Sequence, residues 1–227
     1  MSFDPGSRAR LTPRALGQFQ GDTLFHRVAR VICVADCLPR KELFESWEVA
    51  RRARRRFRGG RVVDLACGHG LLAHLMLLLD DTSMAALAVD SRLPGSAPRI
   101  AGAIEAEWPR IAGRITLARR SIAEVELTRD DLVVSAHPCG ALTDEILERA
   151  SSARARIVVL PCCHDTSGGD QGGLGGWLDP ALAIDVTRAA RLRSMGYTVR
   201  TQSIPEAITP KNRLLLAEPN ALSNLAR

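Results

Sequence analysis

Short apolar runs alternate with helical stretches along the chain after Gly59-Gly60. This alternation is typical of βαβ units, in which helices connect the strands of a parallel sheet. Seven strands are predicted, at Arg61–Ala66, Met84–Asp90, Arg114–Ala118, Asp131–Ala136, Arg156–Leu160, Thr198–Ser203 and Arg213–Ala217. Helices are predicted between most of them, at Leu71–Leu79, Ala97–Trp108, Leu142–Arg149 and Pro180–Ser194.

The residues before this alternation have a different pattern. From Leu11 to Arg58, apolar positions recur three and four residues apart, and nothing alternates as a strand does. We therefore expect an N-terminal helical extension at 1–58, followed by one compact α/β domain at 59–227. Within that domain, Thr166–Gly176 contains six glycines and no periodicity. This segment predicts a mobile loop, either a plain linker or a lid.

Composition excludes some classes of protein. No stretch approaches the roughly 20 apolar residues that a membrane-spanning helix needs, and Met1–Arg14 lacks the apolar core of a secretory signal. The six cysteines follow no regular framework, which favours reduced thiols over disulfides. We therefore expect a cytoplasmic protein without membrane contact.

The net charge of +6 comes from one segment. Between Pro39 and Arg61 there are nine cations and three anions, and the rest of the chain is balanced. The arginines of Arg51–Arg61 would attract phosphates, so RNA is the expected partner of this segment. The alternative is an ordinary solvated helix, because acidic residues precede the arginines in the order that the helix dipole prefers.

The segment Arg61–Gly70 joins an apolar strand to a glycine-containing turn that opens a helix. Glycines allow a ligand to approach the backbone, and the helix N-terminus offers free N–H groups. Asp64 lies near the end of this strand, and Asp90 ends the next strand, 20 residues after Gly70. An acid at that position can accept the hydroxyl groups of a ribose. These features fit a dinucleotide as well as S-adenosylmethionine (SAM).

Asp64 favours SAM over a dinucleotide. Its carboxylate would repel a pyrophosphate above the turn, whereas it would attract the ammonium and sulfonium groups of SAM. An oxidoreductase that uses a nicotinamide cofactor is the remaining alternative, because Gly68–Ala73 also satisfies the G-x-G-x-x-[G/A] pattern.

The turn resembles the first motif of the class I SAM-dependent methyltransferases, with Ala66 in place of the usual first glycine. The resemblance implies a Rossmann-like seven-stranded sheet whose last strand runs antiparallel between strands five and six. It also implies that Ser121 or Ile122 lies beside the adenine. The expected cofactor-binding residues are Asp64, Ala66, Cys67, Gly68, Gly70, Asp90, Ser121, Ile122 and Ser135.

Thiols and imidazoles gather after strands four and five, in His137–Asp144 and Cys162–His164. A histidine there could remove the proton of a hydroxyl nucleophile during methyl transfer. Cysteine and histidine sets also bind zinc, but the usual C-x₂-C spacing is missing, so no metal is predicted. A third interpretation is that small thiols, Cys67 and Cys162 above all, simply pack at crowded strand ends.

These two motifs resemble those of the eukaryotic tRNA ribose 2′-O-methyltransferases, which have His-x-Cys-Gly-x-x-Thr-Asp and Cys-Cys-His-His. Asp165 departs from the last histidine, and the zinc fingers of that family have no counterpart. The resemblance implies an RNA methyltransferase acting on a ribose hydroxyl, with reaction-side residues His137, Cys139, Asp144 and His164. The alternatives are a small-molecule or protein methyltransferase and a catalytically silent binding module.

Overall fold

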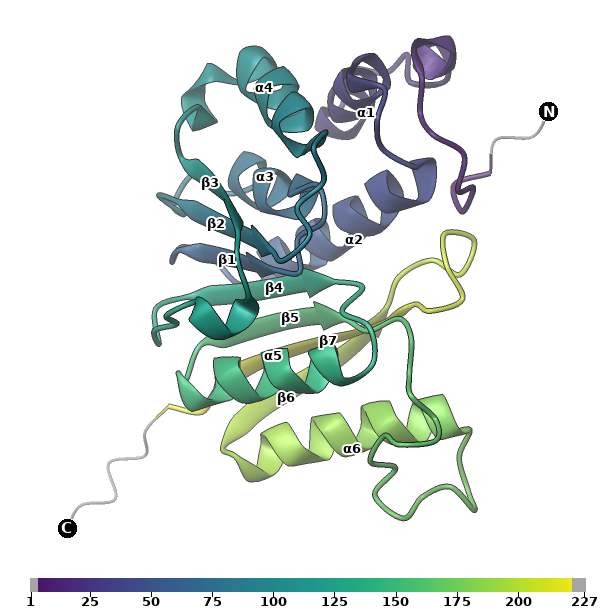
Figure 1. Ribbon diagram of the computed structural model, residues 1–227, viewed down its shortest axis with the longest axis vertical. Helices are drawn as coiled ribbons and strands as arrows, with labels where there is room; N and C mark the ends of the chain where they lie inside the picture. Colours follow the sequence, from purple (N-terminus) through teal and green to yellow (C-terminus); the bar gives the residue numbers. More distant parts are fainter. Residues whose placement is uncertain (1–3, 222–227) are drawn as a thin grey trace.

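The computed structural model describes residues 4–221 and contains one seven-stranded mixed sheet (Figure 1). The strand order is β3-β2-β1-β4-β5-β7-β6. The strands are β1 (Val62–Leu65), β2 (Ala86–Asp90), β3 (Ile115–Arg119), β4 (Leu132–Ala136), β5 (Arg156–Leu160), β6 (Tyr197–Ser203) and β7 (Arg213–Pro219). All seven predicted strands are present, which confirms the Rossmann-like α/β fold.

The predicted insertion of the last strand is also confirmed. Strand β7 pairs antiparallel with β5, with Val158 opposite Leu216. It also pairs antiparallel with β6, where Val199 lies opposite Ala217. The other neighbouring strands are parallel, so their carboxyl ends meet at one edge of the sheet.

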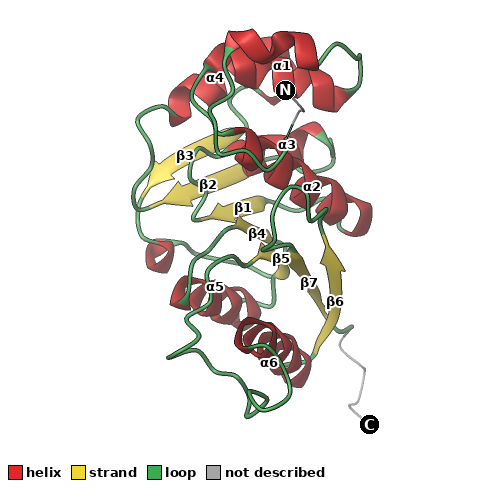
Figure 2. Cartoon of the chain, turned by 90° about the vertical axis from the view of Figure 1, so that its right-hand side faces the viewer, coloured by secondary structure: helices red, strands yellow, loops and turns green. Residues whose placement is uncertain are grey.

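Helices cover both faces of the sheet (Figure 2). One face carries α1 (Leu24–Ala35), α2 (Arg40–Arg56), α3 (Leu71–Leu78) and α4 (Ala97–Glu107). The other carries α5 (Ala141–Ser152) and α6 (Pro180–Ser194). Short 3₁₀ turns lie at Pro13–Gln18, Pro109–Ile111 and Ile122–Glu124. None of the helices in residues 4–221 combines the length and the apolar character needed to cross a bilayer.

The N-terminal helices share a hydrophobic core with the sheet. Every residue of α3 is buried, because α2 covers the side of α3 that faces away from the strands. A buried ion pair links α2 to the chain before β2: Arg54 Nη1 lies 3.0 Å from Asp80 Oδ2, and both side chains are at most 3% exposed. Helix α2 is therefore held firmly against the first strands, which fixes its position beside the cofactor turn.

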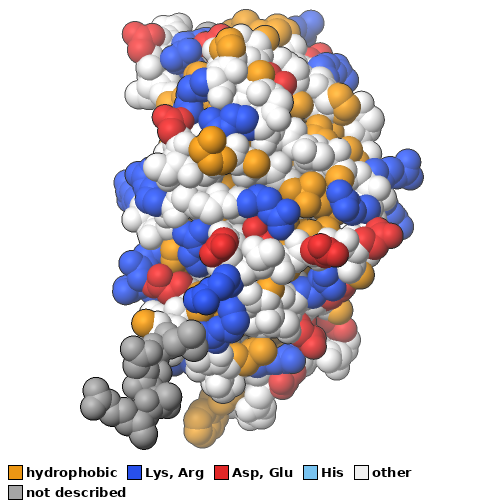
Figure 3. Space-filling view, turned by 90° about the vertical axis from the view of Figure 1, so that its left-hand side faces the viewer, with side chains coloured by type: hydrophobic (Ala, Val, Ile, Leu, Met, Phe, Trp, Pro, Cys, Tyr) orange, Lys and Arg blue, Asp and Glu red, His pale blue; other side chains and the backbone are white. Residues whose placement is uncertain are grey.

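The arginine-rich segment Arg51–Arg61 lies away from the carboxyl edge. Arg61 precedes β1 and pairs with Asp131, which precedes β4. Six of the seven arginines in this segment have carboxylate partners: Arg51 and Arg52 with Glu48, Arg54 and Arg58 with Asp80, Arg56 with Glu218, and Arg61 with Asp131. Figure 3 faces the side where β4 and β5 begin, and cationic and anionic side chains are interspersed there. Because α2 runs antiparallel to β1, its arginine-rich end lies at the amino ends of the strands and not beside the cofactor turn.

Candidate active site

The turn after β1 contains three residues with a left-handed backbone conformation. Ala66, Gly68 and Gly70 have φ angles of 58°, 52° and 74°, in the left-handed region that favours glycine. Gly70 is also the residue that precedes α3, and a Cβ atom added there would lie 2.7 Å from Leu117 Cδ2. The positive φ and this close contact both favour glycine at the position where the helix begins.

Asp64 is completely enclosed beneath this turn. Its Oδ2 atom accepts a hydrogen bond from the Ala73 N–H at 3.2 Å, while its buried Oδ1 atom has no partner among the described residues. Burial raises the pKa of Asp64 to about 8, and the nearby Asp90 and Glu42 carboxylates add to this effect. A buried acceptor without a donor is costly unless a ligand satisfies it. Asp64 is therefore suited to a cationic ligand.

Asp90 contacts the same turn from the next strand. Its Oδ2 atom accepts a hydrogen bond from the Gly68 N–H at 2.9 Å, and its Oδ1 atom accepts one from the Arg92 N–H at 2.8 Å. Each carboxylate oxygen can accept a second bond. The side chain is thus held at the carboxyl edge with capacity left for ligand hydroxyl groups.

A cavity of about 390 Å³ opens above this turn. Five predicted site residues line it: Asp64, Ala66, Cys67, Gly68 and His137. Its other walls come largely from the chain around the start of α2, including Arg8, Lys41, Glu42 and Glu45. Burial, followed by the Asp64 carboxylate, raises the pKa of the Cys67 thiol well above its usual range. Cys67 is therefore an uncharged packing residue of the cavity wall.

His137 is held by a carboxylate from α2. Its Nε2 atom lies 2.6 Å from Glu45 Oε2, and Lys41 Nζ lies 2.6 Å from Glu45 Oε1. Burial alone would raise the pKa of Glu45, but the hydrogen bonds and charges of His137 and Lys41 outweigh it and lower that pKa. Glu45 is therefore ionised, and it orients the imidazole at the mouth of the cofactor cavity.

Glu42 and Glu45 were interpreted from the sequence only as charges supporting a helix. In the structure, Glu42 Oε1 lies 3.3 Å from Nδ1 of His69, whose Nε2 lies 3.1 Å from Ser96 Oγ. The two acids are three residues apart and share one helix face. The spacing of the two acids predicts a shared helix face. It does not predict that this face contacts the cofactor turn.

Three predicted cofactor residues make protein contacts instead of lining this cavity. Ser121 caps the 3₁₀ turn at Ile122–Glu124, and its hydroxyl accepts a hydrogen bond from the Ala123 N–H at 3.2 Å. Ile122 is buried in the core on the α5 side. Ser135 is completely buried, and its hydroxyl donates to the Leu65 carbonyl at 2.6 Å. Ser135 thus joins β4 to β1 just below the cofactor turn.

The thiols after β4 and β5 come together. The Sγ atoms of Cys139 and Cys162 are 3.2 Å apart, and the Cys163 Sγ atom belongs to the same cluster. Burial is the main cause that raises the pKa of the Cys162 thiol well above its usual range. Thr143 closes the loop after β4 by donating to the Pro138 carbonyl at 2.7 Å.

Asp144 and His164 belong to a separate network on the α6 side. Asp144 binds Arg188 through two hydrogen bonds of 2.8 and 2.7 Å. His164 Nε2 lies 2.7 Å from Asp185 Oδ1, and its Nδ1 atom is buried without a partner among the described residues. Arg188 Nη1 lies 3.3 Å from the same Asp185 oxygen. The four predicted reaction-side residues are therefore divided between the cofactor cavity, the thiol cluster and this network.

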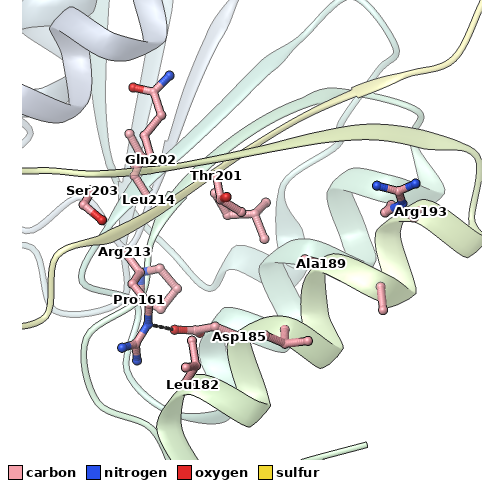
Figure 4. Close-up of a pocket in the computed structure, with 13 residues that line it drawn as sticks. Pro161, Leu182, Asp185, Ala189, Arg193, Thr201, Gln202, Ser203, Arg213 and Leu214 are labelled. Carbon is pink, nitrogen blue, oxygen red and sulfur yellow. Dashed lines mark hydrogen bonds and ion pairs between the residues drawn. The ribbon is translucent and has the colours of Figure 1, made fainter. Parts of the chain in front are cut away.

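A second cavity, of about 620 Å³, lies between α6 and the β6–β7 edge (Figure 4). Arg213 Nε lies 2.7 Å from Asp185 Oδ2 at one end of it, and Pro161 lies at the same end. None of the residues of the cofactor turn line it. The smaller cavity, which contains Asp64 and His137, is therefore the candidate active site.

The fold and this cavity define a class I SAM-dependent methyltransferase. Residues 42–167, more than half of the chain, match the family described as a methyltransferase domain. The chain belongs to this family. That assignment decides between the two cofactors considered from the sequence, because it implies SAM and not a nicotinamide dinucleotide. No curated protein matches the chain with significance.

Solved methyltransferase structures share the fold at low sequence identity. An O-methyltransferase family protein from Burkholderia thailandensis is 16% identical, with a TM-score of 0.53 over 96% of this chain and 66% of that one. The M1A22 tRNA methyltransferase TrmK of B. subtilis is 18% identical, with a TM-score of 0.52 over 78% and 65% of the two chains. The precorrin-6y C5,15-methyltransferase of Geobacter metallireducens is 14% identical, with a TM-score of 0.50 over 77% and 87%. The chain spans about two thirds of the first two proteins. The three names describe different kinds of methyltransferase.

Proposed function

We propose that this methyltransferase transfers the methyl group of SAM to a ribose 2′-hydroxyl of RNA, with His137 as the general base. The observation that carries the proposal is the Glu45–His137 pair, 2.6 Å apart, in the cavity that contains Asp64. An acceptor hydroxyl needs a base within reach when it attacks the methyl group. His137 is the histidine that lines this cavity.

The cofactor would be held by both acids at the strand ends. SAM supplies an electrophilic methyl group on a positively charged sulfur. We assign the cationic part of SAM to the free Oδ1 atom of Asp64 and the ribose hydroxyls to Asp90. Ser121 and Ile122, which follow β3, are assigned to the adenine side. The positive charge would also favour the ionised form of Asp64.

The proton would leave through the imidazole. Glu45 occupies the Nε2 side of His137, so Nδ1 is the atom assigned to accept the hydroxyl proton. The ionised Glu45 would then stabilise the imidazolium, as a carboxylate does for a catalytic histidine. Lys41 keeps Glu45 charged throughout. Cys139, Asp144 and His164 are proposed to shape the acceptor side beyond His137.

RNA as the acceptor is supported by the resemblance of His137–Asp144 and Cys162–His164 to the ribose 2′-O-methyltransferase motifs. Arg8 and Lys41 line the cofactor cavity and would contact phosphates beside it. The segment Arg51–Arg61 is proposed as a more distant contact. Its exposed Arg55 is the member without an ion pair among the described residues.

The test is to incubate the protein and tritiated SAM separately with total RNA, protein and a small-molecule extract, followed by nucleoside analysis. We expect label in a 2′-O-methylated nucleoside, and a rate lower by about 10²- to 10⁴-fold in His137→Ala. Glu148→Gln, at an exposed position of α5 outside the cofactor cavity, is the control and should retain activity. Label only in protein or small molecules would contradict the RNA proposal, and SAM binding without any turnover would indicate a silent binding module.

Measuring the RNA affinity of two charge-reversed variants distinguishes the two cationic surfaces. Arg8→Glu should weaken RNA binding more than Arg55→Glu, because Arg8 lies at the cavity and Arg55 at the opposite end of α2. Equal effects of the two variants would place RNA on both surfaces. A larger effect of Arg55→Glu would make Arg51–Arg61 the main contact.

A further inference from the structure

We propose that Cys139, Cys162 and Cys163 form a binding site for a thiophilic divalent metal ion, with Zn²⁺ as the expected occupant. The three Sγ atoms all lie within 4.8 Å of one another. None of the three cysteines is in a disulfide. The site is separate from the cofactor cavity, and its existence does not depend on which acceptor the enzyme methylates.

The spacing of the sulfur atoms fits coordination by one ion. Zinc binds cysteine sulfur at about 2.3 Å, so two sulfurs of a tetrahedral site are about 3.8 Å apart. The separation of Cys139 and Cys162 is 3.2 Å, and the other pairs reach no further than 4.8 Å. These limits, 3.2 and 4.8 Å, lie on either side of the separation of about 3.8 Å that one tetrahedral ion requires.

The loops that carry these cysteines are tied together. The Gly140 N–H donates to the Cys163 carbonyl at 2.6 Å, which joins the loop after β4 to the loop after β5. Arg188, held by Asp144, donates to the Gly140 carbonyl at 3.3 Å. A preorganised site binds a ligand more tightly, because less ordering is needed on binding.

This framework gives the motif His137–Asp144 a physical interpretation. Thr143 fixes the loop through the Pro138 carbonyl, and Asp144 positions Arg188 against Gly140. Both motif residues thus act on the backbone that presents Cys139. The guanidinium of Arg188 also lies near a site that would carry a net negative charge, because three thiolates exceed the charge of one divalent ion.

One coordination position would remain open. No further histidine, cysteine or acidic side chain among residues 4–221 belongs to the cluster. Two of the three cysteines, Cys139 and Cys163, are exposed, so water or a ligand atom can reach the metal. Three protein ligands with an open fourth position is the arrangement of catalytic rather than structural zinc sites. On binding, the ion displaces the three thiol protons, which are released to solvent.

The first measurement is the metal content and Zn²⁺ affinity of the reduced full chain, by elemental analysis and by competition with a chromogenic chelator. We expect one Zn²⁺ per chain. Co²⁺ in place of Zn²⁺ should give the near-ultraviolet charge-transfer band of thiolate ligands. No binding of either ion by the reduced, folded protein would overturn the proposal.

Single cysteine-to-serine variants locate the site. Cys139→Ser, Cys162→Ser and Cys163→Ser should each weaken Zn²⁺ binding by at least about tenfold and reduce the Co²⁺ band. Cys37→Ser is the matched control, since Cys37 lies in the chain between α1 and α2, outside the cluster. Cys163 is exposed, so its variant should remain folded, which circular dichroism checks. Unchanged affinity in Cys163→Ser and Cys139→Ser would contradict the site, as would equal loss in Cys37→Ser.

Discussion

At the scale of single residues, Asp64 has the most unusual environment in the site. It is 1% exposed, and one carboxylate oxygen has no hydrogen-bond donor among the described residues. An apolar residue at this position would make the fold more stable, because a buried acid without a full set of hydrogen-bond partners destabilises the protein. The acid is therefore best explained by a ligand that the folded cavity is built to receive.

The pKa of Asp64 predicts how stability changes with pH. The native pKa of about 8 is higher than the ordinary value of 3.8, so between these values the native state holds a proton that the unfolded state has lost. Stability should therefore fall as pH rises from 5 to 8, by up to about 1.4 kcal/mol per unit from this group. Urea unfolding at several pH values measures this slope. Asp64→Asn should flatten it, whereas Asn in place of the exposed Asp22 should not.

Ala66 allows a second prediction at this scale. Its φ of 58° lies in the left-handed region, where the Cβ atom of alanine causes strain. The glycine that methyltransferases usually have at this position would be unstrained. Ala66→Gly should therefore stabilise the protein by about 1 kcal/mol, after the larger entropy of glycine in the unfolded chain is subtracted. Thermal unfolding measures the shift. Ala103→Gly, within α4, should have the opposite sign, and a loss of stability in both variants would rule out strain at Ala66.

At the scale of elements, α2 makes an unexpected contribution to the site. Arg54 and Arg56, near its end, pair with Asp80 and Glu218 at the amino ends of the parallel strands. Glu42 and Glu45, near its start, line the cofactor cavity. The helix thus runs along the strands from their carboxyl ends to their amino ends. An element predicted from the sequence only as part of an N-terminal helical extension supplies the partner of His137.

Glu45→Gln tests this contribution. The amide cannot stabilise a protonated imidazole as the carboxylate does, so we expect kcat to fall by about 10²-fold or more. SAM affinity should change little, because Asp64 and Asp90 are unaffected. Initial rates and calorimetry on the same sample separate the two effects. An equal loss of kcat and SAM affinity would instead indicate collapse of the cavity wall.

The strands and helices were predictable because their signals are local. Apolar runs such as those of β4 and β5 and the glycine at position 70 determine an element and its start within a few residues. The site contacts are different, since Glu45 meets His137 across 92 positions of sequence and Arg61 meets Asp131 across 70. No spacing rule covers such pairs. The sequence therefore predicted the cavity residues of the turn after β1, but it did not predict those that α2 contributes.

At the scale of the whole molecule, the sheet gathers the site from distant segments. Parallel strands β1, β2, β4 and β5 end at one edge, where the cofactor turn, Asp90, His137 and the thiol cluster follow them. The arginines that dominate the net charge lie at the other edge and are largely neutralised by carboxylates. The candidate active site and the arginine-rich segment thus lie at opposite ends of the strands.

Calorimetric titration of SAM into the wild-type protein, Asp64→Asn and Asp90→Ala tests the central claim most directly, with NAD as the comparison ligand. We predict one SAM site in the wild type, no heat with NAD, and affinity lower by roughly 10- to 100-fold in each variant, since each loses hydrogen bonds to a charged group. Unfolding curves at neutral pH verify that both variants are folded. Wild-type protein that binds no SAM, or folded variants that bind it as tightly as wild type, would contradict the account.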